Sequence, residues 1–423
     1  MFQTLRNAWK IPDLRHKILF TLMMIAVFRL GTFIPVPGLD PNAFAQLLGE
    51  NGDNLFSLMD AFSGGAFSNA TIFAMSITPY INSSIILQLL TVAIPALERM
   101  SKEGEEGRKK LAQWTRYGTV ILAFIQATGL YFSLRGALTN TGFLPYITIV
   151  ASFTAGTAFL MWLGEKITEH GVGNGISMII FAGIVSSLPS MVKGIYDNFI
   201  LGAINIWAVI ALAVIALAVV AFVVFMNDSE RRIPVQYAKR MVGRKMYGGQ
   251  STHIPIKVSM AGVIPVIFAM SIMAFPATIM QFTGQPATGS FMYKVMAVLS
   301  PGSWFYMVMY FLLIIFFTYF YTAIQFNPIE VANNMKKNGG FVPGIRPGKP
   351  TSDFISRVLT RITLAGALFL AVVALLPLLA GKFVGFSISI GGTSLLIMVG
   401  VALETVKQIE TQMLMRHYKG FLE

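Results

Sequence analysis

Residues 202–226, GAINIWAVIALAVIALAVVAFVVFM, form an uninterrupted apolar stretch that decides the fold class of this chain. None of these 25 residues is charged. An α-helix needs about 20 mostly apolar residues to cross the hydrocarbon core of a bilayer, because each residue advances the helix by only about 1.5 Å. The stretch therefore predicts a transmembrane helix.

Similar stretches lie on both sides of this one. Ten apolar ranges in all predict membrane spans: 18–36, 71–97, 115–134, 143–164, 175–193, 202–226, 258–282, 303–326, 358–380 and 392–414. The fifth contains Pro189, which spanning helices tolerate when neighbouring groups satisfy the backbone. We expect an all-α integral membrane protein with ten transmembrane helices, and we interpret the run from Ile18 as the first span rather than a cleaved signal.

The composition favours a lipid-facing surface. Of the 423 residues, 55% are hydrophobic and 12% are charged, about half the charged share of an ordinary soluble domain. A soluble core of this size could not hide so much apolar surface. The chain has no cysteine, which excludes disulfides, thiolate metal ligands and cysteine nucleophiles.

Lysine and arginine are distributed unevenly among the predicted connections. With a cytosolic N-terminus, 27 of the 32 lie in cytosolic segments, and the other five are Arg29, Arg135, Lys193, Lys294 and Lys382. Connections rich in Lys and Arg stay on the cytosolic side of a membrane. The split predicts that both termini are cytosolic, and the net charge of +13 indicates affinity for anionic lipid.

The ten predicted spans divide into five and five at about residue 198. A repeated unit with an odd number of spans enters the membrane upside down the second time. The count therefore permits two inverted halves, 1–198 and 199–423, with a central site between them. This interpretation rests on the count, because no clear residue-level repeat accompanies it.

Two long connections on the predicted cytosolic side, 227–257 and 327–357, are too polar to lie in the membrane. Their basic residues include Arg231, Arg232, Lys239, Arg240, Arg244, Lys245, Lys336, Lys337, Arg346 and Lys349. Such loops can rest on anionic headgroups. Two of them on one side favour the alternative, which is docking of a large partner.

The connection 53–70 on the predicted external side has an apolar pattern of its own. Leu55, Leu58, Met59 and Phe62 recur at helical spacing before Gly64 and Gly65 break the pattern. The segment is too short to span, so it predicts a re-entrant half-helix. The alternative is an amphipathic helix on the outer leaflet.

Motifs for catalysis are missing from the sequence. There is no Walker phosphate loop, no H-E-x-x-H and no pair of carboxylates at useful spacing inside a span. The glycine-rich stretch 171–175 follows no predicted strand and precedes no Lys-Ser/Thr, so we expect it to begin the fifth span, with Asn174 as its cap. Arg29 lies near the outer end of the first span and can snorkel toward water. We predict that the chain is not an enzyme and needs no cofactor.

Isoleucine shares helical faces with polar residues in four of the predicted spans. The isoleucines concerned are Ile81 and Ile85, which share a face with Gln88, together with Ile180, Ile267 and Ile397. Such faces suit a water-filled funnel with a narrow apolar waist. The alternative is that these isoleucines face lipid or pack between helices.

Eight motifs in order give the chain a family resemblance along essentially its whole length. They are FRLGTFIPVPGLDP (28–41), ITPYINSSIILQLLT (77–91), KEGEEGRKKLAQWTRYGT (102–119), GEKITEHGVGNGISMIIFAGI (164–184), RRIPVQYAKR (231–240), STHIPIKVSMAGVIPVIFA (251–269), QFNPIEVANNMKKNGGFVPGIRPG (325–348) and GGTSLLIMVGVALET (391–405). With these motifs the chain resembles the SecY family, the main subunits of bacterial protein-translocation channels. The stretch 283–302 has no family motif.

The resemblance implies a pore between two inverted five-helix halves. It implies that the waist is a ring of five residues: Ile81, Ile85, Ile180, Ile267 and Ile397. It also implies a plug helix over about 55–67 that includes Leu55, Phe56, Leu58, Met59, Phe62 and Phe67. A lateral gate would open to lipid between spans two and three on one side and spans seven and eight on the other.

The resemblance also implies partners. Membrane subunits SecE and SecG would surround the channel, and either the motor ATPase SecA or the ribosome would dock on the basic loops. The implied docking residues are Arg240, Arg244, Lys245, Lys336, Lys337 and Arg346. Signal peptides and secretory precursors would be the cargo, in the bacterial cytoplasmic membrane. An inverted-repeat secondary transporter and a non-channel scaffold or insertase remain the alternatives.

Overall fold

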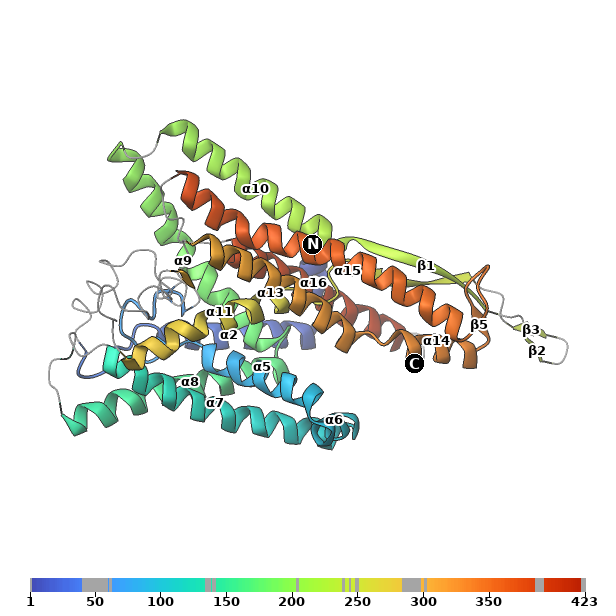
Figure 1. Ribbon diagram of the computed structural model, residues 1–423, viewed down its shortest axis with the longest axis horizontal. Coiled ribbons are helices and arrows are strands. Elements are labelled where there is room, and N and C mark those ends of the chain that lie inside the picture. Colours follow the sequence, from blue (N-terminus) through green and yellow to red (C-terminus); the bar gives the residue numbers. More distant parts are fainter. Residues whose placement is uncertain are drawn as a thin grey trace.

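The computed structural model describes residues 2–39, 60, 63–133, 138, 142–202, 205–237, 240–242, 245–247, 251–283, 298–299, 303–384 and 392–419. Within these residues the chain is mostly helical. Figure 1 shows most long helices running along the long axis of the molecule, with β-strands projecting beyond them at one end.

Each of the long helices overlaps one of the predicted apolar ranges. They are α2 (Pro12–Gly31), α5 (Thr78–Ala93), α7 (Glu105–Ser133), α8 (Phe143–His170), α9 (Gly175–Ile200), α10 (Ile206–Asp228), α11 (Ile264–Thr283), α13 (Trp304–Gln325), α15 (Lys349–Val384) and α16 (Gly392–Lys419). Shorter helices are α1 (Phe2–Trp9), α6 (Pro95–Lys102) and α14 (Pro328–Lys337). The predicted division at residue 198 falls inside α9, which continues to Ile200.

Several of these helices could cross a membrane. Among the described residues, four are long and apolar enough: Phe143–His170, Gly175–Ile200, Trp304–Lys337 and Lys349–Leu376. The bent pair of α5 and α6 makes a fifth if it counts as one span. Others fall short because they include charged residues, as α2 does, or because their apolar segment is short, as in Ile264–Pro276. The chain is a multi-pass helical membrane protein, and the number ten stays a prediction.

The second predicted span, 71–97, was wrong at both ends. Residues 72–77 form turns, and α5 begins at Thr78 with Pro79 in its first turn, where a proline leaves no helical hydrogen bond unmade. At the other end Ile94 has the extended backbone that a following proline favours, and α6 leaves α5 at an angle of 102°.

The two predicted cytosolic loops contain a β-sheet, which the sequence interpretation missed. Strands β1 (Glu230–Tyr237), β4 (Ser251–Lys257) and β5 (Gly340–Phe341) pair antiparallel in the order β4-β1-β5, with Ile233 opposite Ile254. At the tip, β2 (Arg240–Val242) pairs with β3 (Lys245–Tyr247). Because β5 belongs to the second loop, the sheet joins the two loops. We call residues 227–257 and 327–357 together the joined loops.

A common apolar core holds the two loops together. Ile233 and Ile256 of the hairpin pack in one cluster with Met335 of α14 and Ile355 of α15. The range 327–357 is therefore not a loop throughout, because α14 occupies 328–337 and α15 begins at Lys349. Pro350 fits there, since the first turn of a helix tolerates proline.

The start of α9 follows the sequence interpretation. The Asn174 side chain accepts hydrogen bonds from the backbone N–H groups of Ile176, at 3.1 Å, and Ser177, at 3.2 Å. These contacts satisfy two donors that the first turn of a helix leaves free. The prediction of Asn174 as the helix cap is confirmed.

Candidate functional site

The five isoleucines predicted for the waist lie on α5, α9, α11 and α16. Ile180 and Ile397 are buried, and they share an apolar cluster with the partly buried Ile81 and Ile267. Ile85 is buried in a neighbouring cluster formed mainly by α11, α13, α15 and α16, and Ile81 packs against both clusters. Helices far apart in the sequence thus converge on these side chains.

The segment that precedes α5 packs into the same cluster. Ala66 and Phe73 of this segment are buried there together with Phe28 of α2. Backbone hydrogen bonds fix the segment to the end of α2: the Val36 N–H donates to the Ala70 carbonyl at 2.9 Å, and the Ile72 N–H donates to the Ile34 carbonyl at 3.1 Å. We call residues 63–77 the turn segment.

The plug prediction falls only partly on described residues. Leu55, Phe56, Leu58, Met59 and Phe62 lie outside them, whereas Phe67 is described and buried. The structure corrects the end of the predicted helix, 55–67, because residues 64–67 form turns and a bend. Gly64 and Gly65 have φ angles of +66° and +84°, a left-handed backbone that glycine adopts at little cost and that ends a helix.

A partly buried carboxyl group accepts hydrogen bonds at the start of the turn segment. Asp60 Oδ1 accepts a hydrogen bond of 2.7 Å from the Ser68 N–H, and the Asp60 carbonyl accepts from the Gly65 N–H at 3.1 Å. Burial raises the pKa of the Asp60 carboxyl above its ordinary value, although the hydrogen bonds from Ser68 oppose the shift. The segment is therefore tied at Asp60 as well as at the end of α2.

The sequence interpretation expected Arg29 to snorkel outward toward water. In the structure its side chain points inward instead. Its Nη1 donates inward to the Gly64 carbonyl at 2.9 Å and to Ser186 Oγ on α9 at 3.1 Å. Snorkelling serves a cation that lacks partners near the membrane interior. Here the Gly64 carbonyl of the turn segment is such a partner.

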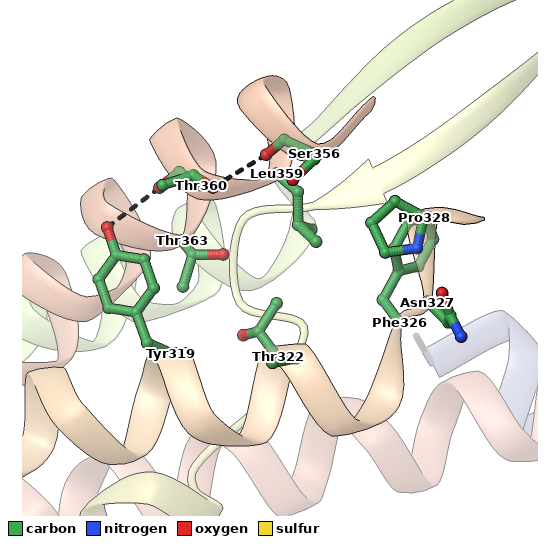
Figure 2. Close-up of a pocket in the computed structure, with 10 residues that line it drawn as sticks. Tyr319, Thr322, Phe326, Asn327, Pro328, Ser356, Leu359, Thr360 and Thr363 are labelled. Atoms are coloured by element: carbon green, nitrogen blue, oxygen red, sulfur yellow. Dashed lines mark hydrogen bonds between the residues drawn. The ribbon is translucent and has the colours of Figure 1, made fainter. Parts of the chain in front are cut away.

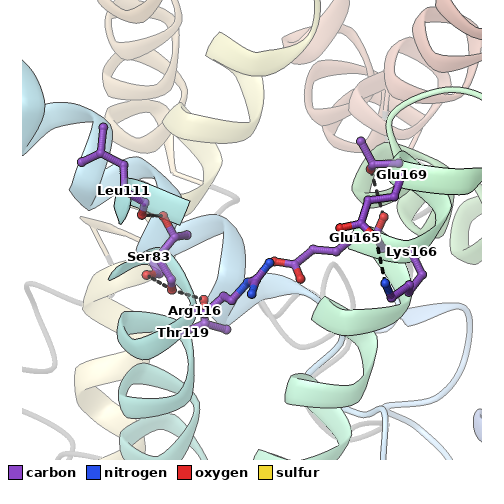
Figure 3. A network of polar contacts seen from close by, with 10 residues as sticks. Ser83, Leu111, Arg116, Thr119, Glu165, Lys166 and Glu169 are labelled. Carbon is purple, nitrogen blue, oxygen red and sulfur yellow. Dashed lines mark hydrogen bonds and ion pairs between the residues drawn. The ribbon is translucent and has the colours of Figure 1, made fainter. Parts of the chain in front are cut away.

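A polar seam joins α5, α7 and α8, and Figure 3 shows it. Ser83 Oγ of α5 donates to the Thr115 carbonyl of α7 at 2.9 Å, and Arg116 Nε donates to Glu165 Oε1 of α8 at 2.7 Å. Small residues let helices approach closely in a membrane. Sequence reasoning missed this contact, although the small residues at Ser83 and Gly118 were a signal for it.

We expect Gly118→Leu to destabilise the protein. A Cβ atom at Gly118 would lie 2.5 Å from Ser83 Oγ, so a larger side chain must push α5 away from α7. Overpacking of this kind costs about 1–3 kcal/mol. The midpoint of thermal unfolding in detergent measures the loss. Gly194→Leu in α9 is the matched control, because nothing lies within 4 Å of its Cβ position. Equal midpoints for the two variants would contradict the close contact.

The predicted docking residues lie on the joined loops. Arg240 is in β2 and Lys245 in β3 at the tip of the hairpin, while Arg244 lies outside the described residues. Lys336 and Lys337 are exposed in the last turn of α14, and Arg346 is exposed in the turn after β5. The structure thus places the described ones, Arg240, Lys245, Lys336, Lys337 and Arg346, at the end of the molecule where the strands project (Figure 1).

A pocket of about 360 Å³ lies between α13, α14 and α15 (Figure 2). Hydroxyl groups of Thr322, Ser356, Thr360 and Thr363 line it, and Tyr319 Oη donates to the Thr360 carbonyl at 3.1 Å. None of the described residues that line it is charged. Within the described part of the chain, no three His, Asp or Glu side chains are placed to hold a metal ion.

Long apolar helices that converge on a buried isoleucine cluster, with a folded segment packed against it, are the architecture of a multi-pass helical membrane protein. The SecY family model matches residues 71–406. Protein translocase subunit SecY of Halalkalibacterium halodurans is 49% identical over 436 residues, covering 100% of both chains. That of Escherichia coli K12 is 46% identical over 419 residues, covering 98% of this chain and 95% of its own. The chain belongs to the SecY family.

Solved structures share the fold. The structure of a protein conducting channel has a TM-score of 0.65 at 20% identity, and one of a SecY protein whose plug domain stabilises the closed state has 0.68 at 19%; each alignment covers 94% of this chain and 92% of the other. Sec61 in the canine ribosome-channel complex has a TM-score of 0.62 at 18% identity, covering 94% and 92%. The family consists of channel subunits, which confirms the prediction that the chain is not an enzyme.

Proposed function

We propose that this chain is the protein-conducting subunit of a translocation channel, with ten spans in two inverted halves. It passes unfolded secretory polypeptides across the bacterial cytoplasmic membrane and releases signal sequences and membrane spans sideways into lipid. One observation carries the proposal: Ile180 and Ile397 are buried together with Ile81 and Ile267 in one cluster, in a member of the SecY family.

The waist acts as an apolar gasket. Isoleucine side chains offer neither donors nor acceptors, so they do not hold a passing polypeptide by hydrogen bonds. When the pore is empty, an apolar constriction loses its water and impedes ions. The predicted plug, about 55–67, is a second barrier on the outer side, and its last residues belong to the turn segment.

The lateral gate lies between α5 and α7 on one side and α11 and α13 on the other. Ile85 of α5 is buried in a cluster with Phe268 of α11 and Phe317 of α13, which supports a closed seam at this position. An apolar signal sequence replaces these contacts with its own when it enters.

Energy comes from a partner, because the sequence contains no phosphate-binding motif. The motor SecA or a ribosome docks on the joined loops through Arg240, Lys245, Lys336 and Arg346, and SecE and SecG complete the membrane complex. Two fold relatives support the ribosome as a partner, since Sec61 and Ssh1 were solved bound to ribosomes. Anionic lipid headgroups bind basic residues of the joined loops that these partners leave uncovered.

Reconstitution tests the proposal. Vesicles that hold the chain with SecE and SecG should protect a labelled secretory precursor from protease only when SecA and ATP are added. The rival secondary transporter would instead take up a small labelled solute down an ion gradient. Solute uptake without precursor protection would overturn the proposal, and neither activity would favour a scaffold.

We expect the segment 98–116, the joined loops and both termini to be cytosolic. The split of Lys and Arg predicts this, and Ala8, Leu14 and Ile409 pack together, which places the first helices beside α16. Because the native chain has no cysteine, single cysteines can be introduced. An impermeant thiol reagent added to intact cells should leave Glu103→Cys and Thr252→Cys unlabelled.

The control for this labelling is Asn69→Cys, an exposed position on the predicted outer side. It should react in intact cells, whereas the cytosolic cysteines should react only after the cells are opened. Labelling of Glu103→Cys or Thr252→Cys in intact cells would show that the topology is inverted.

A further inference from the structure

A single cationic side chain joins three separate segments beside the plug. Arg29 Nη1 donates to the Gly64 carbonyl of the turn segment at 2.9 Å, to Ser186 Oγ of α9 at 3.1 Å and to Thr32 Oγ1 at 3.4 Å. The guanidinium carbon lies 5.0 Å from the centre of the Phe33 ring. These contacts bring α2, the turn segment and α9 together at one group.

The backbone at Gly64 is shaped for this contact. Gly64 is buried and has a φ of +66°, and a Cβ atom there would lie 2.3 Å from Ser186 Oγ and 3.0 Å from the Gly183 carbonyl oxygen. The turn segment therefore lies directly on α9, with no room for a side chain. Its carbonyl is left accessible to Arg29 from the side of α2.

The partners of Arg29 that the structure describes are neutral oxygens and an aromatic ring. A partly buried guanidinium depends on such acceptors, because an unpaired charge at membrane depth is costly. Withdrawal of the turn segment removes the shortest of the three hydrogen bonds. Arg29 therefore favours the position in which Gly64 rests on α9.

We propose that Arg29 is the latch of the closed channel: it holds the base of the plug to α2 and α9 and sets the threshold at which the plug is released. This inference rests on the proposed function, since it requires the plug to be a closing segment. Arg29 is a positioning residue and acts through the Gly64 carbonyl. Opening replaces this carbonyl with water of the outer funnel or with carbonyl groups of the passing chain.

Arg29→Met tests the latch, because methionine keeps an unbranched side chain and removes every donor. We expect the idle channel to conduct ions about ten times more often than the parent, the change that loss of one hydrogen bond to a charged group predicts. Export of a precursor with a defective signal should rise by a similar factor, while export of a normal precursor changes little. Arg29→Lys should lie between the parent and Arg29→Met, because a lysine offers donors without the planar fork.

Two further variants separate the latch from a general loss of structure. Arg15→Met, at an exposed position of the same helix, should behave like the parent. Ser186→Ala leaves the Gly64 contact in place and should have a smaller effect in the same direction. If Arg29→Met destabilises assembly, Arg29→Lys and Ser186→Ala still decide the question by the ratio of defective to normal export.

The outcomes distinguish the latch from the proposed function. If neither the parent nor a variant of the isoleucine cluster transports precursor or conducts, the proposed function fails. If a cluster variant such as Ile397→Asn leaks while Arg29→Met, Arg29→Lys and Ser186→Ala all stay sealed and reject the defective signal, the channel stands and the latch is overturned.

Discussion

Ile397→Asn is expected to make the closed channel leak ions and accept precursors with defective signal sequences. Ile397 is 1% exposed and packs in the same cluster as Ile180. A carboxamide offers water two donors and an acceptor where isoleucine offers none, so the substitution favours water at the narrowest point. The lost apolar burial also weakens the closed state by about 1–3 kcal/mol, which is about a 5- to 150-fold change in the ratio of closed to open channels.

Ion current across planar bilayers measures the leak, and export of the defective precursor measures the loss of discrimination. Ile85→Asn and Ile267→Asn should act in the same direction. Ile215→Asn in α10 is the matched control, because it makes the same chemical change at a side chain that is 48% exposed and lies outside the cluster. It should leave the ion current unchanged. The waist lies elsewhere if all three cluster variants stay sealed and reject the defective precursor.

Arg346→Glu is expected to stop motor-driven translocation while the channel still assembles. Arg346 is exposed, and the turn that carries it is held by its backbone: Thr351 Oγ1 donates to the Arg346 carbonyl at 2.8 Å, and the Ile345 N–H donates to the Val342 carbonyl at 3.0 Å. Charge reversal leaves these bonds intact and replaces attraction to an acidic partner surface with repulsion. Arg240→Glu should act in the same direction with a smaller effect.

Transport of a precursor into vesicles with SecA and ATP measures this effect, and we expect a loss of about tenfold or more from one reversed contact at a docking surface. Arg108→Glu is the control, because Arg108 is also exposed but lies in α7, outside the joined loops. Near-normal transport by Arg346→Glu, or an equal loss with Arg108→Glu, would remove the docking role from this arginine.

The apolar runs predicted where the long helices lie, because the thickness of a bilayer imposes a minimum length on any span. They did not predict where helices end. Pro79 and Pro95 decide both ends of α5 through backbone geometry, which a count of apolar residues does not contain. The family resemblance predicted that the five isoleucines form the waist. Periodicity alone was equally consistent with isoleucines that face lipid or pack between helices.

The sheet was not predicted, because the two connections were interpreted by their basic residues alone. In β1, buried Ile233 and Val235 alternate with exposed Arg232 and Pro234, which is the period of a half-buried strand. This signal was present in the sequence. The contact of Arg29 with Gly64 was not, because 35 residues separate the two groups and only the packed fold brings them together.

We expect the isoleucine cluster to link the thermal stability of the protein to its rate of export. Its members come from α2, α8 and α9 early in the chain and from α11 and α16 late in it, so the same side chains seal the pore and hold distant parts of the protein together. In a protein whose cluster is packed more tightly for stability at high temperature, the closed state is more stable relative to the open state, so each export cycle must overcome a larger free-energy difference. Such channels should be slow at moderate temperature and should recover their pace only near the temperature at which the organism lives.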